Sequence, residues 1–277
     1  MKKIISLAIV AVMLVCTLFS FTSCFSNIMI GVQAGTTGQY FVNGDEDWGF
    51  SGLEGYEAKG YANGGLAVTD MKNGSIDYVI IDKAPAIQLD KAIDGIKVIN
   101  IELTEETYAF GVDKAQSSLL TAINTVLATK QTEIKAIIDK YAKGENIVGI
   151  SSAEKDLDRT NEQLVVATNA AFAPFEYKDG DKFAGIDIEI MALVASELGL
   201  ELVIEDMKFD AVVTSVGKHG VDVAAAGLSV NEERAKSVNF SNTYYDAAQV
   251  LIVPETCTDF DGCNTAEDVI AKLNELK

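Results

Sequence analysis

The chain has 277 residues, of which 48% are hydrophobic and 23% are charged, and its formal net charge is −19 at pH 7. This length and hydrophobic content allow two lobes with buried cores and argue against general disorder. The excess of acidic residues argues against a nucleic-acid partner, because phosphate contacts draw their free energy from Lys and Arg.

The first residues have the pattern of an export signal. Lys2 and Lys3 precede an apolar run over residues 4–21, and small polar residues and Cys24 follow. We therefore assign residues 1–24 to a signal peptide. The Thr-Ser-Cys ending resembles a bacterial lipobox, in which Cys24 becomes the lipidated first residue of the mature protein, although Phe21 stands where that pattern prefers Leu. A plain cleaved signal and an uncleaved anchor are the alternatives, because about 18 apolar residues can span a bilayer.

After this signal, short β-branched runs alternate with amphipathic helical stretches. In chain order, the expected strands are residues 28–33, 78–81, 98–101, 108–112, 164–168, 201–205, 221–224 and 249–253. The expected helices are residues 65–72, 114–129, 132–141, 187–198 and 265–276. Short apolar strands separated by helices predict α/β lobes with largely parallel sheets that are covered on both faces.

Two further features concern the organisation of the chain. Residues 71–80 and 218–224 both read as a helix end, a Gly turn, an Asp and a strand, which indicates two related lobes. Residues 143–162 are polar and charged and predict a linker.

Four cysteines are present, and Cys16 and Cys24 belong to the signal region. Cys257 and Cys263 remain, and in an exported protein they can form a disulfide; two free thiols are the alternative. Two cysteines without a nearby His or further Cys make a poor zinc site, so we expect no metal and no cofactor.

An α-amino acid requires a cation for its carboxylate, an anion for its ammonium group and a pocket for its side chain. The loop 226–234 follows an expected strand and leads into a helix that Asn231 can cap. Gly227 and Ser229 offer backbone groups and a hydroxyl at the carboxyl end of a strand, where α/β folds bind ligands. Arg234 can clamp a carboxylate with two parallel hydrogen bonds, and an ordinary surface ion pair is its alternative role.

Several segments resemble polar-amino-acid-binding proteins, the family 3 extracellular solute-binding proteins. Residues 164–177, 183–187, the Phe209 loop, 227–234 and 238–241 match the first lobe of that family in order and spacing, and residues 30–38 (with Gly-Thr-Thr-Gly) and 76–82 resemble its second lobe. The resemblance implies a two-lobed, periplasmic-binding-protein-like type II (Venus flytrap) fold. It also implies a non-enzymatic receptor that captures an amino acid and delivers it to the permease of an ABC transporter.

The lobes come in the reverse of the family's order. Joining Lys277 to Asn27 would restore the usual order, so we interpret the chain as a circular permutant in which residues 143–162 connect the former ends. The second lobe would comprise residues 27–104 and 255–277, and the first lobe residues 105–254. Lobe crossings are then expected near residues 103–109 and 253–256.

The resemblance also implies a role for each pocket residue. The carboxylate would be held by Arg234, Ser229 and the backbone of Thr36 and Thr37, and the ammonium group by Asp82 and the Gly227 carbonyl. Phe172 and Phe209 would sandwich the side chain, and Asn169 and Gln33 would lie near its tip. Family members that hold lysine or arginine often have a carboxylate at the position of Asn169. Its amide therefore favours a neutral polar amino acid, although Glu176 or Asp210 could compensate for a cationic side chain.

The remaining expectations concern location and rival functions. The resemblance implies an extracytoplasmic monomer that is anchored to the membrane through lipid on Cys24. Trp48 lies in an acidic run over residues 44–49, which we interpret as a solvated surface loop, and the single histidine, His219, as a surface residue. Rival functions are a dehydratase on the same fold, with Glu176 as its candidate acid or base, and a sensory amino-acid-binding domain.

Overall fold

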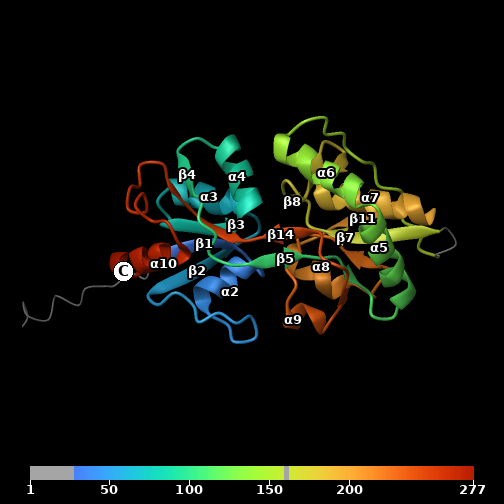
Figure 1. Cartoon of the computed structure of the whole chain (residues 1–277), viewed down its shortest axis with the longest axis horizontal. Helices are drawn as coiled ribbons and strands as arrows, with labels where there is room; N and C mark the ends of the chain where they lie inside the picture. The colour runs from blue at the N-terminus through green and yellow to red at the C-terminus, as the bar shows by residue number, and fades with distance from the viewer. Residues whose placement is uncertain (1–27, 159–161) are drawn as a thin grey trace, which may run out of the picture.

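The computed structural model describes residues 28–158 and 162–277 and divides them into two α/β lobes (Figure 1). The predicted signal peptide and the lipidation site Cys24 lie outside the described residues. Within the described ranges, no helix is both long enough and apolar enough to cross a membrane.

One lobe, which we call the β1 lobe and which contains most of the predicted second lobe, is built on a five-stranded sheet of order β2-β1-β3-β15-β4. Its strands are β1 (Ile28–Gln33), β2 (Tyr56–Tyr61), β3 (Tyr78–Asp82), β4 (Ile96–Ile99) and β15 (Gln249–Pro254). β1 is parallel to β2 and β3, whereas β15 is antiparallel to β3 and β4. The helices are α2 (Thr37–Asn43), α3 (Gly64–Lys72), α4 (Lys83–Ala92) and α10 (Ala266–Leu276).

Alternation along the central strands of this sheet divides the core of the β1 lobe into two layers. Val79 and Ile81 of β3 pack in one cluster with Val68 of α3, and Ile80 packs in a second cluster with Phe41 of α2 and Leu273 of α10. Successive side chains of a strand point to opposite faces, so an uninterrupted apolar run requires helices on both sides. The predicted largely parallel, doubly covered sheet is therefore confirmed.

The other lobe, the β7 lobe, corresponds to the predicted first lobe and contains a five-stranded sheet of order β11-β7-β12-β6-β13. Its strands are β6 (Gly111–Val112), β7 (Gln163–Thr168), β11 (Glu201–Asp206), β12 (Val223–Ala224) and β13 (Asn239–Phe240). A small sheet is formed by β8 (Ala171–Phe172), β9 (Glu176–Asp179) and β10 (Lys182–Ala184), and the helices are α5 (Ser117–Thr129), α6 (Gln131–Lys143), α7 (Ile186–Leu198), α8 (Phe209–Ser215) and α9 (Glu232–Ala235).

Both large sheets follow one plan. In each, three parallel strands are followed by a strand that is antiparallel to its neighbours, namely β15 in the β1 lobe and β6 in the β7 lobe. The two lobes are thus related in topology, as the repeated helix–turn–strand segments predicted.

The lobes are joined by a two-stranded antiparallel ribbon of β5 (Glu106–Tyr108) and β14 (Tyr245–Ala247) (Figure 1). The first crossing falls at β5, within the predicted range. The second crossing was predicted near residues 253–256, and this prediction is wrong, because β15 already pairs with β3 and β4 in the β1 lobe. An apolar run reveals a buried strand but not the sheet to which it belongs, so residues 249–254 were assigned to the wrong lobe.

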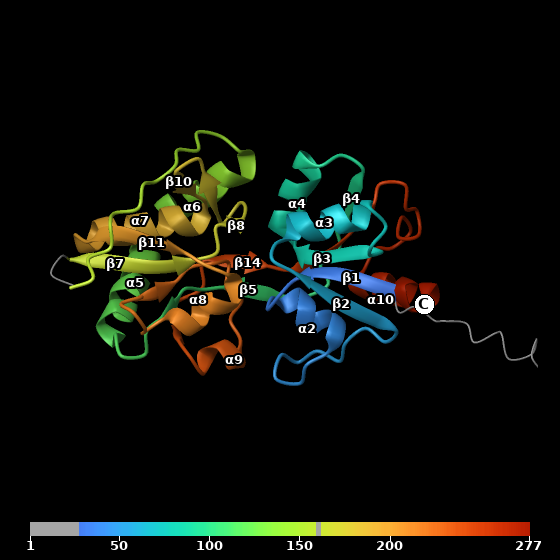
Figure 2. The same ribbon diagram turned by 180° about the vertical axis from the view of Figure 1, so that it is seen from behind.

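The end of α10 lies beside the start of the β1 sheet (Figure 1, Figure 2). The Tyr56 hydroxyl donates a hydrogen bond of 2.6 Å to the carbonyl of Leu273, and Lys277 Nζ lies 3.1 Å from a carboxylate oxygen of Glu54. Because Tyr56 pairs with Ile28, the first described residue and Lys277 lie at the same edge of the lobe.

Two predicted local features differ from the structure. Residues 143–162 were predicted to be a linker, but the described residues of this segment pack on the β7 lobe. The Ile150 N–H donates to the Phe183 carbonyl at 2.7 Å, and the Ala153 N–H donates to the Leu202 carbonyl at 2.9 Å. Cys257 and Cys263 are free, half-buried thiols, so the favoured disulfide is not formed. Both side chains pack against the apolar cluster under α10 instead of against each other.

Candidate binding site between the lobes

Residues from the two lobes meet across the cleft beside the β5–β14 ribbon. Gln33 Nε2 donates to Asn169 Oδ1 at 3.3 Å, Arg234 Nη2 donates to the Gly35 carbonyl at 3.2 Å, and Thr37 Oγ1 lies 3.3 Å from Ser229 Oγ. In each pair, one residue belongs to the β1 lobe and the other to the β7 lobe. The structure therefore brings together residues that lie more than 130 positions apart in the sequence.

Arg234 is held at the start of the short helix α9. The Asn231 side chain accepts the Arg234 backbone N–H at 2.8 Å, which confirms the predicted cap. The guanidinium is only 8% exposed, and Nη1 donates to the Ser229 carbonyl at 2.9 Å. Burial lowers the pKa of Arg234, and the negative charges of Glu106 and Asp82 oppose this shift.

Arg234 forms no ion pair with any residue in the ranges 28–158 and 162–277. The alternative role as a surface ion pair is therefore wrong. A guanidinium carries five N–H donors, and two hydrogen bonds of the Arg234 guanidinium are formed within the part of the chain that the structure describes. The remaining N–H groups can donate to a carboxylate, which would also compensate the buried charge.

The loop that carries Gly227 and Ser229 is attached to strand β5. The Ala109 N–H donates to the Leu228 carbonyl at 3.1 Å, and the Val230 N–H donates to the Thr107 carbonyl at 3.0 Å. Gly227 has a φ of 52°, and a Cβ atom there would lie 2.8 Å from the ring of Phe172. Both the backbone conformation and the contact with Phe172 require glycine at this position.

Asp187 of helix α7 holds the Gly227 loop through a hydrogen bond to the backbone. It accepts the Gly227 N–H at 2.9 Å and the Tyr244 hydroxyl at 2.5 Å. Burial raises the pKa of Asp187 to about 7, and the two hydrogen bonds oppose the shift. The sequence motif around residues 183–187 pointed to this segment, but the role of Asp187 as the acceptor for the Gly227 N–H was not predicted.

Asp82 ends strand β3 and is 4% exposed. The Tyr108 hydroxyl donates to Asp82 Oδ1 at 2.5 Å. Burial and then the charge of Glu106 raise the pKa of Asp82 to about 7, while hydrogen bonds from Tyr108 and Gln249 lower it. Asp82 lines a cavity of about 240 Å³. A buried carboxylate with a raised pKa is stabilised as an anion by a nearby cation, so this position suits an ammonium group.

The residues predicted to contact the side chain of the ligand lie at separate places around the cleft. Phe172 stacks on Phe175 with a ring-centroid distance of 5.9 Å, whereas the ring of Phe209 lies 5.4 Å from the Arg234 guanidinium carbon. Asn169 Nδ2 donates to the Met207 carbonyl at 2.7 Å. Gln33 Oε1 is buried and has no hydrogen-bond partner among the described residues, so it is available as an acceptor.

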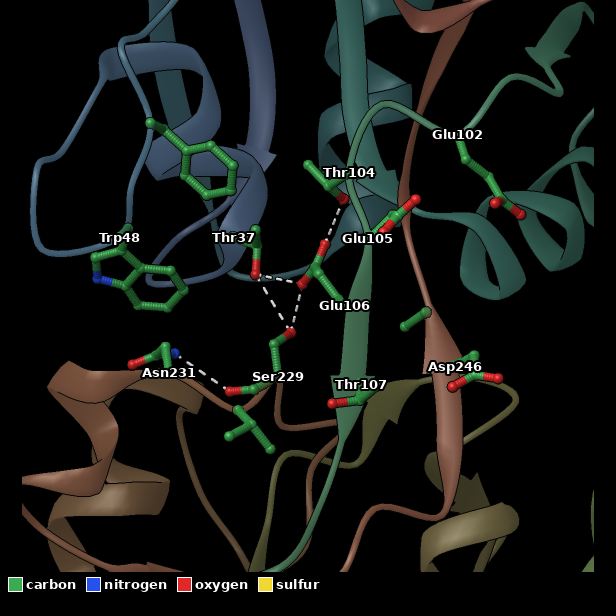
Figure 3. Close-up of a pocket in the computed structure, with 13 residues that line it drawn as sticks. Thr37, Trp48, Glu102, Thr104, Glu105, Glu106, Thr107, Ser229, Asn231 and Asp246 are labelled. Atoms are coloured by element: carbon green, nitrogen blue, oxygen red, sulfur yellow. Dashed lines mark hydrogen bonds between the residues drawn. The ribbon is translucent and has the colours of Figure 1, made fainter.

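Thr36 and Thr37 differ in what they offer. The backbone N–H and the hydroxyl of Thr36 both donate to the Gln33 carbonyl, at 3.4 and 2.8 Å, so both donors are used within the loop. The Thr37 hydroxyl instead faces Ser229 across the cleft (Figure 3). Of the two threonines, Thr37 is the one placed to contact a molecule between the lobes.

Glu106 is a site residue that the sequence did not reveal. Its carboxylate accepts hydrogen bonds from Thr37 Oγ1 and Ser229 Oγ, both at 2.6 Å (Figure 3). The other oxygen accepts from Thr104 Oγ1 at 2.7 Å and Gln249 Nε2 at 3.0 Å. The hydroxyls of Thr37 and Ser229 thus hold a carboxylate of the protein, and this contact of the Thr37 hydroxyl was not predicted. One glutamate in a polar stretch carries no motif that could have identified it.

Two further features surround these residues. A cavity of about 620 Å³ opens beside Glu106 and is lined by residues of both lobes and of the ribbon, including Thr37, Trp48, Ser229 and Asp246 (Figure 3).

Glu176 is completely buried, and neither carboxylate oxygen has a hydrogen-bond partner within the described ranges. Burial, followed by the charges of Asp187 and Asp82, raises the pKa of Glu176 well above its usual value.

Comparison with known proteins gives a match in the second half of the chain. Residues 164–274 match the sequence model of the bacterial extracellular solute-binding proteins, family 3. The arginine-binding extracellular protein ArtP of Bacillus subtilis is 31% identical over 106 residues, which are 38% of this chain and 42% of ArtP. The probable arginine-binding protein ArtJ of Chlamydia trachomatis is 28% identical over 97 residues, which are 35% of this chain and 38% of ArtJ.

A probable histidine-binding protein of Neisseria gonorrhoeae is 29% identical over 91 residues, covering 32% of this chain and 34% of that protein. The alignments with these relatives thus span about two fifths or less of the relatives' own lengths. Among solved structures, the arginine-bound domain 1 of TmArgBP is 30% identical, covers 44% of this chain and 99% of that domain, and gives a TM-score of 0.31.

Proposed function

We propose that this chain, which belongs to the bacterial extracellular solute-binding proteins of family 3, captures a free amino acid between its two lobes. One observation carries the proposal: a buried guanidinium (Arg234) and a buried carboxylate (Asp82) lie in the same interlobe region without forming an ion pair with each other. These two charges complement the carboxylate and the ammonium group of an α-amino acid. Buried charges that are not paired within a protein are costly, and such a ligand would compensate both.

The side chain of the ligand is proposed to be polar and neutral. Gln33 and Asn169 meet across the cleft from opposite lobes, and Gln33 Oε1 remains available as an acceptor. Amide groups donate and accept, so they suit a carboxamide or hydroxyl tip. The relatives named above are arginine- and histidine-binding proteins, and a cationic side chain is therefore the alternative that the ligand panel below must exclude.

Capture is proposed to occur by hinge closure about the β5–β14 ribbon. The carboxylate contacts come mainly from the β7 lobe, through Arg234 and Ser229, and the ammonium contact from Asp82 of the β1 lobe. A ligand that bridges the lobes binds the closed form more tightly than the open form and shifts the equilibrium towards closure by that difference. Tyr108 links β5 to Asp82, so it couples the hinge to the ammonium site.

The closed receptor is proposed to deliver its amino acid to the permease of an ABC transporter outside the cytoplasm. The relative ArtJ is named as a probable ABC transporter protein, which supports this role. The lipobox-like ending at Cys24 supports attachment to the membrane. Labelling of the expressed protein with a radioactive fatty acid, lost on Cys24→Ala substitution, tests this attachment.

We also propose that the chain is circularly permuted relative to its family. The two sheets share one strand order, each takes its antiparallel strand from a chain segment beyond the lobe crossing, and Lys277 lies beside the edge where β1 begins. A variant that joins residue 277 to residue 28 through a short linker and opens the chain within residues 144–158 should fold and bind the same amino acid. Loss of folding in that variant would contradict the permutation.

Thermal unfolding of the protein in the presence of each of the twenty L-amino acids tests the proposed function. A ligand at 100 times its Kd stabilises the folded state by about 2.7 kcal/mol. For a protein of this size, that corresponds to a Tm rise of roughly 5–10 °C. We expect such a rise with one or a few neutral polar amino acids. A rise only with arginine, lysine or histidine would overturn the neutral specificity, and no rise with any amino acid would overturn the function.

The alternative of a dehydratase depends on Glu176, a buried acid whose pKa burial raises well above its usual value. A general acid must reach the reacting group, and Glu176 is completely buried. We therefore propose binding without turnover. Incubation of the protein with its stabilising amino acid, followed by chromatography, should return the amino acid unchanged; conversion that is lost on Glu176→Gln substitution would favour the enzyme.

A further inference from the structure

Residues 44–52 form a compact loop on the β1 lobe, which we call the Trp48 loop. The Asp45 and Phe50 backbones exchange two hydrogen bonds of 2.8 and 3.0 Å, and the Trp48 N–H donates to Asp45 Oδ1 at 3.2 Å. Phe50 contacts Phe41 of the lobe core edge-on, with ring centroids 5.6 Å apart. The loop is thus a built structure, and its acidic residues Glu46 and Asp47 are exposed, as the sequence predicted.

The base of the loop is narrow enough to require glycine. Gly44 and Gly52 have φ angles of 79° and 80°, and a Cβ atom on either would lie 2.8–2.9 Å from the backbone of the other side. Side chains are excluded at both positions by conformation and by space. This narrow base fixes the direction in which the loop leaves the β1 lobe.

The loop presents Trp48 to the opposite lobe. The Trp48 ring stacks on Tyr40 with centroids 4.1 Å apart and an interplanar angle of 16°. The guanidinium carbon of Arg234, from the β7 lobe, lies 5.1 Å from the centre of the Trp48 ring. Phe209 contacts the same guanidinium from within the β7 lobe at 5.4 Å. Arg234 is therefore in contact with one aromatic ring from each lobe.

A second contact of the loop also crosses the cleft, but it is weaker. Lys236 Nζ lies 3.6 Å from Asp47 Oδ2, and the two side chains are 61% and 71% exposed. Exposed ion pairs of this kind contribute little, because water and salt screen them. The contact between Trp48 and the buried Arg234 is screened far less, and tryptophan is the strongest aromatic partner for a cation.

We propose that Trp48 is a ligand-capturing residue, which completes the Arg234 carboxylate clamp from the opposite lobe when the lobes close. This proposal rests on the proposed function, because the clamp matters only if a carboxylate binds there. Trp48 also lines the cavity between the lobes, together with Thr37 and Asn231 (Figure 3). Its contact with Arg234 exists only in the closed arrangement, and it therefore favours closure and slows release of the ligand.

The sequence contains a single tryptophan, so the proposal has its own spectroscopic readout. Excitation of the wild-type protein at 295 nm reports Trp48 alone, and addition of the stabilising amino acid should change its emission as Arg234 moves onto the ring. Stopped-flow recording of this signal gives the rate of closure and release in the full chain.

The decisive experiment compares Trp48→Ala, Trp48→Phe and Asp47→Asn by calorimetry with that amino acid. Trp48→Ala should raise Kd about 5- to 30-fold, or about 1–2 kcal/mol at 1.4 kcal/mol per tenfold, with most of the change in the release rate. A chase of bound radiolabelled amino acid measures this rate in every variant, because Trp48→Ala and Trp48→Phe contain no tryptophan. Trp48→Phe should lose less, and Asp47→Asn should change Kd less than threefold because it removes only the exposed ion pair. Thermal unfolding without ligand confirms that each variant is folded.

The outcomes separate this proposal from the proposed function. Wild-type protein that binds an amino acid, together with a folded Trp48→Ala variant of unchanged Kd and release rate, would overturn the role of Trp48 alone. Wild-type protein that binds no amino acid would overturn both. An Asp47→Asn variant as weak as Trp48→Ala would assign the effect to the ion pair and overturn the assignment to the ring.

Discussion

Lowering the pH should weaken amino-acid binding through Asp82. Burial and the neighbouring charge of Glu106 raise the pKa of Asp82 to about 7, so this carboxyl is largely protonated at pH 5. A ligand ammonium group requires the ionised form, and its positive charge would hold the pKa of the bound Asp82 far lower. Binding must therefore release one proton below pH 7, and affinity rises as the pH increases towards 7.

The size of this effect follows from the pKa. With a pKa of about 7, only about 1% of the free protein carries ionised Asp82 at pH 5, so Kd should be about 100-fold higher than at pH 8. This corresponds to about 2.7 kcal/mol. Above pH 7 the dependence should flatten, because Asp82 is already ionised.

Calorimetry at pH 5, 6, 7 and 8, in two buffers of different ionisation enthalpy, measures both Kd and the protons released. Asp82→Asn is the matched control, since it keeps the shape of the side chain and cannot titrate; its binding should be weak and independent of pH over this range. Asp187 also has a pKa near 7, and a slope that persists in Asp82→Asn would assign the titration to Asp187. A wild-type Kd that does not change between pH 5 and 8 would refute the ammonium site at Asp82.

Three further predictions concern the same site. Arg234→Ala should weaken binding by about 1.5–3 kcal/mol, the contribution of a charged hydrogen bond, and unchanged affinity by calorimetry would refute the carboxylate clamp. Glu106→Gln should loosen the closed form, because an amide nitrogen cannot accept hydrogen bonds from the two interlobe hydroxyls; an unchanged radius of gyration in small-angle X-ray scattering would contradict this. Folding raises the pKa of Asp82 and of Asp187 to about 7, so the folded state binds these protons more tightly than the unfolded chain and is favoured at low pH. This contribution to the free energy of unfolding is at most roughly 4 kcal/mol for each group, and it is lost as the pH rises through 7. The Tm of the ligand-free Asp82→Asn/Asp187→Asn variant should therefore fall less between pH 5 and 8 than that of wild type, and an equal fall would argue against these groups.

Several elements could be predicted from the sequence because their signals are local. β1 has the predicted bounds, and β3, β7 and β11 begin or end within one residue of theirs, since an apolar β-branched run between turns identifies a strand covered on both faces. Helix α10 begins after Thr265, whose side chain forms a capping box with Asp268. The Arg234 segment was found in the same way, from its cap and its position after a strand.

Other features depend on contacts between distant segments, which no local period encodes. The run at residues 249–254 reads as a strand in either lobe, and only its pairing with β3 and β4 decides the second crossing. Glu106 and Trp48 carry no motif, and their roles arise because the ribbon and the Trp48 loop bring them against Thr37, Ser229 and Arg234.

The sequence by itself determined the two α/β lobes and most of the residues around the cleft, because hydrophobic periodicity and short motifs act over a few neighbouring positions. Only the tertiary structure decided which groups meet across the cleft. Hydrogen bonds and cation–aromatic contacts act over a few ångströms, so Gln33 with Asn169, or Trp48 with Arg234, become partners only when folding brings their lobes together. The same packing sets the pKa of Asp82, because burial and the approach of Glu106 are properties of the folded cleft.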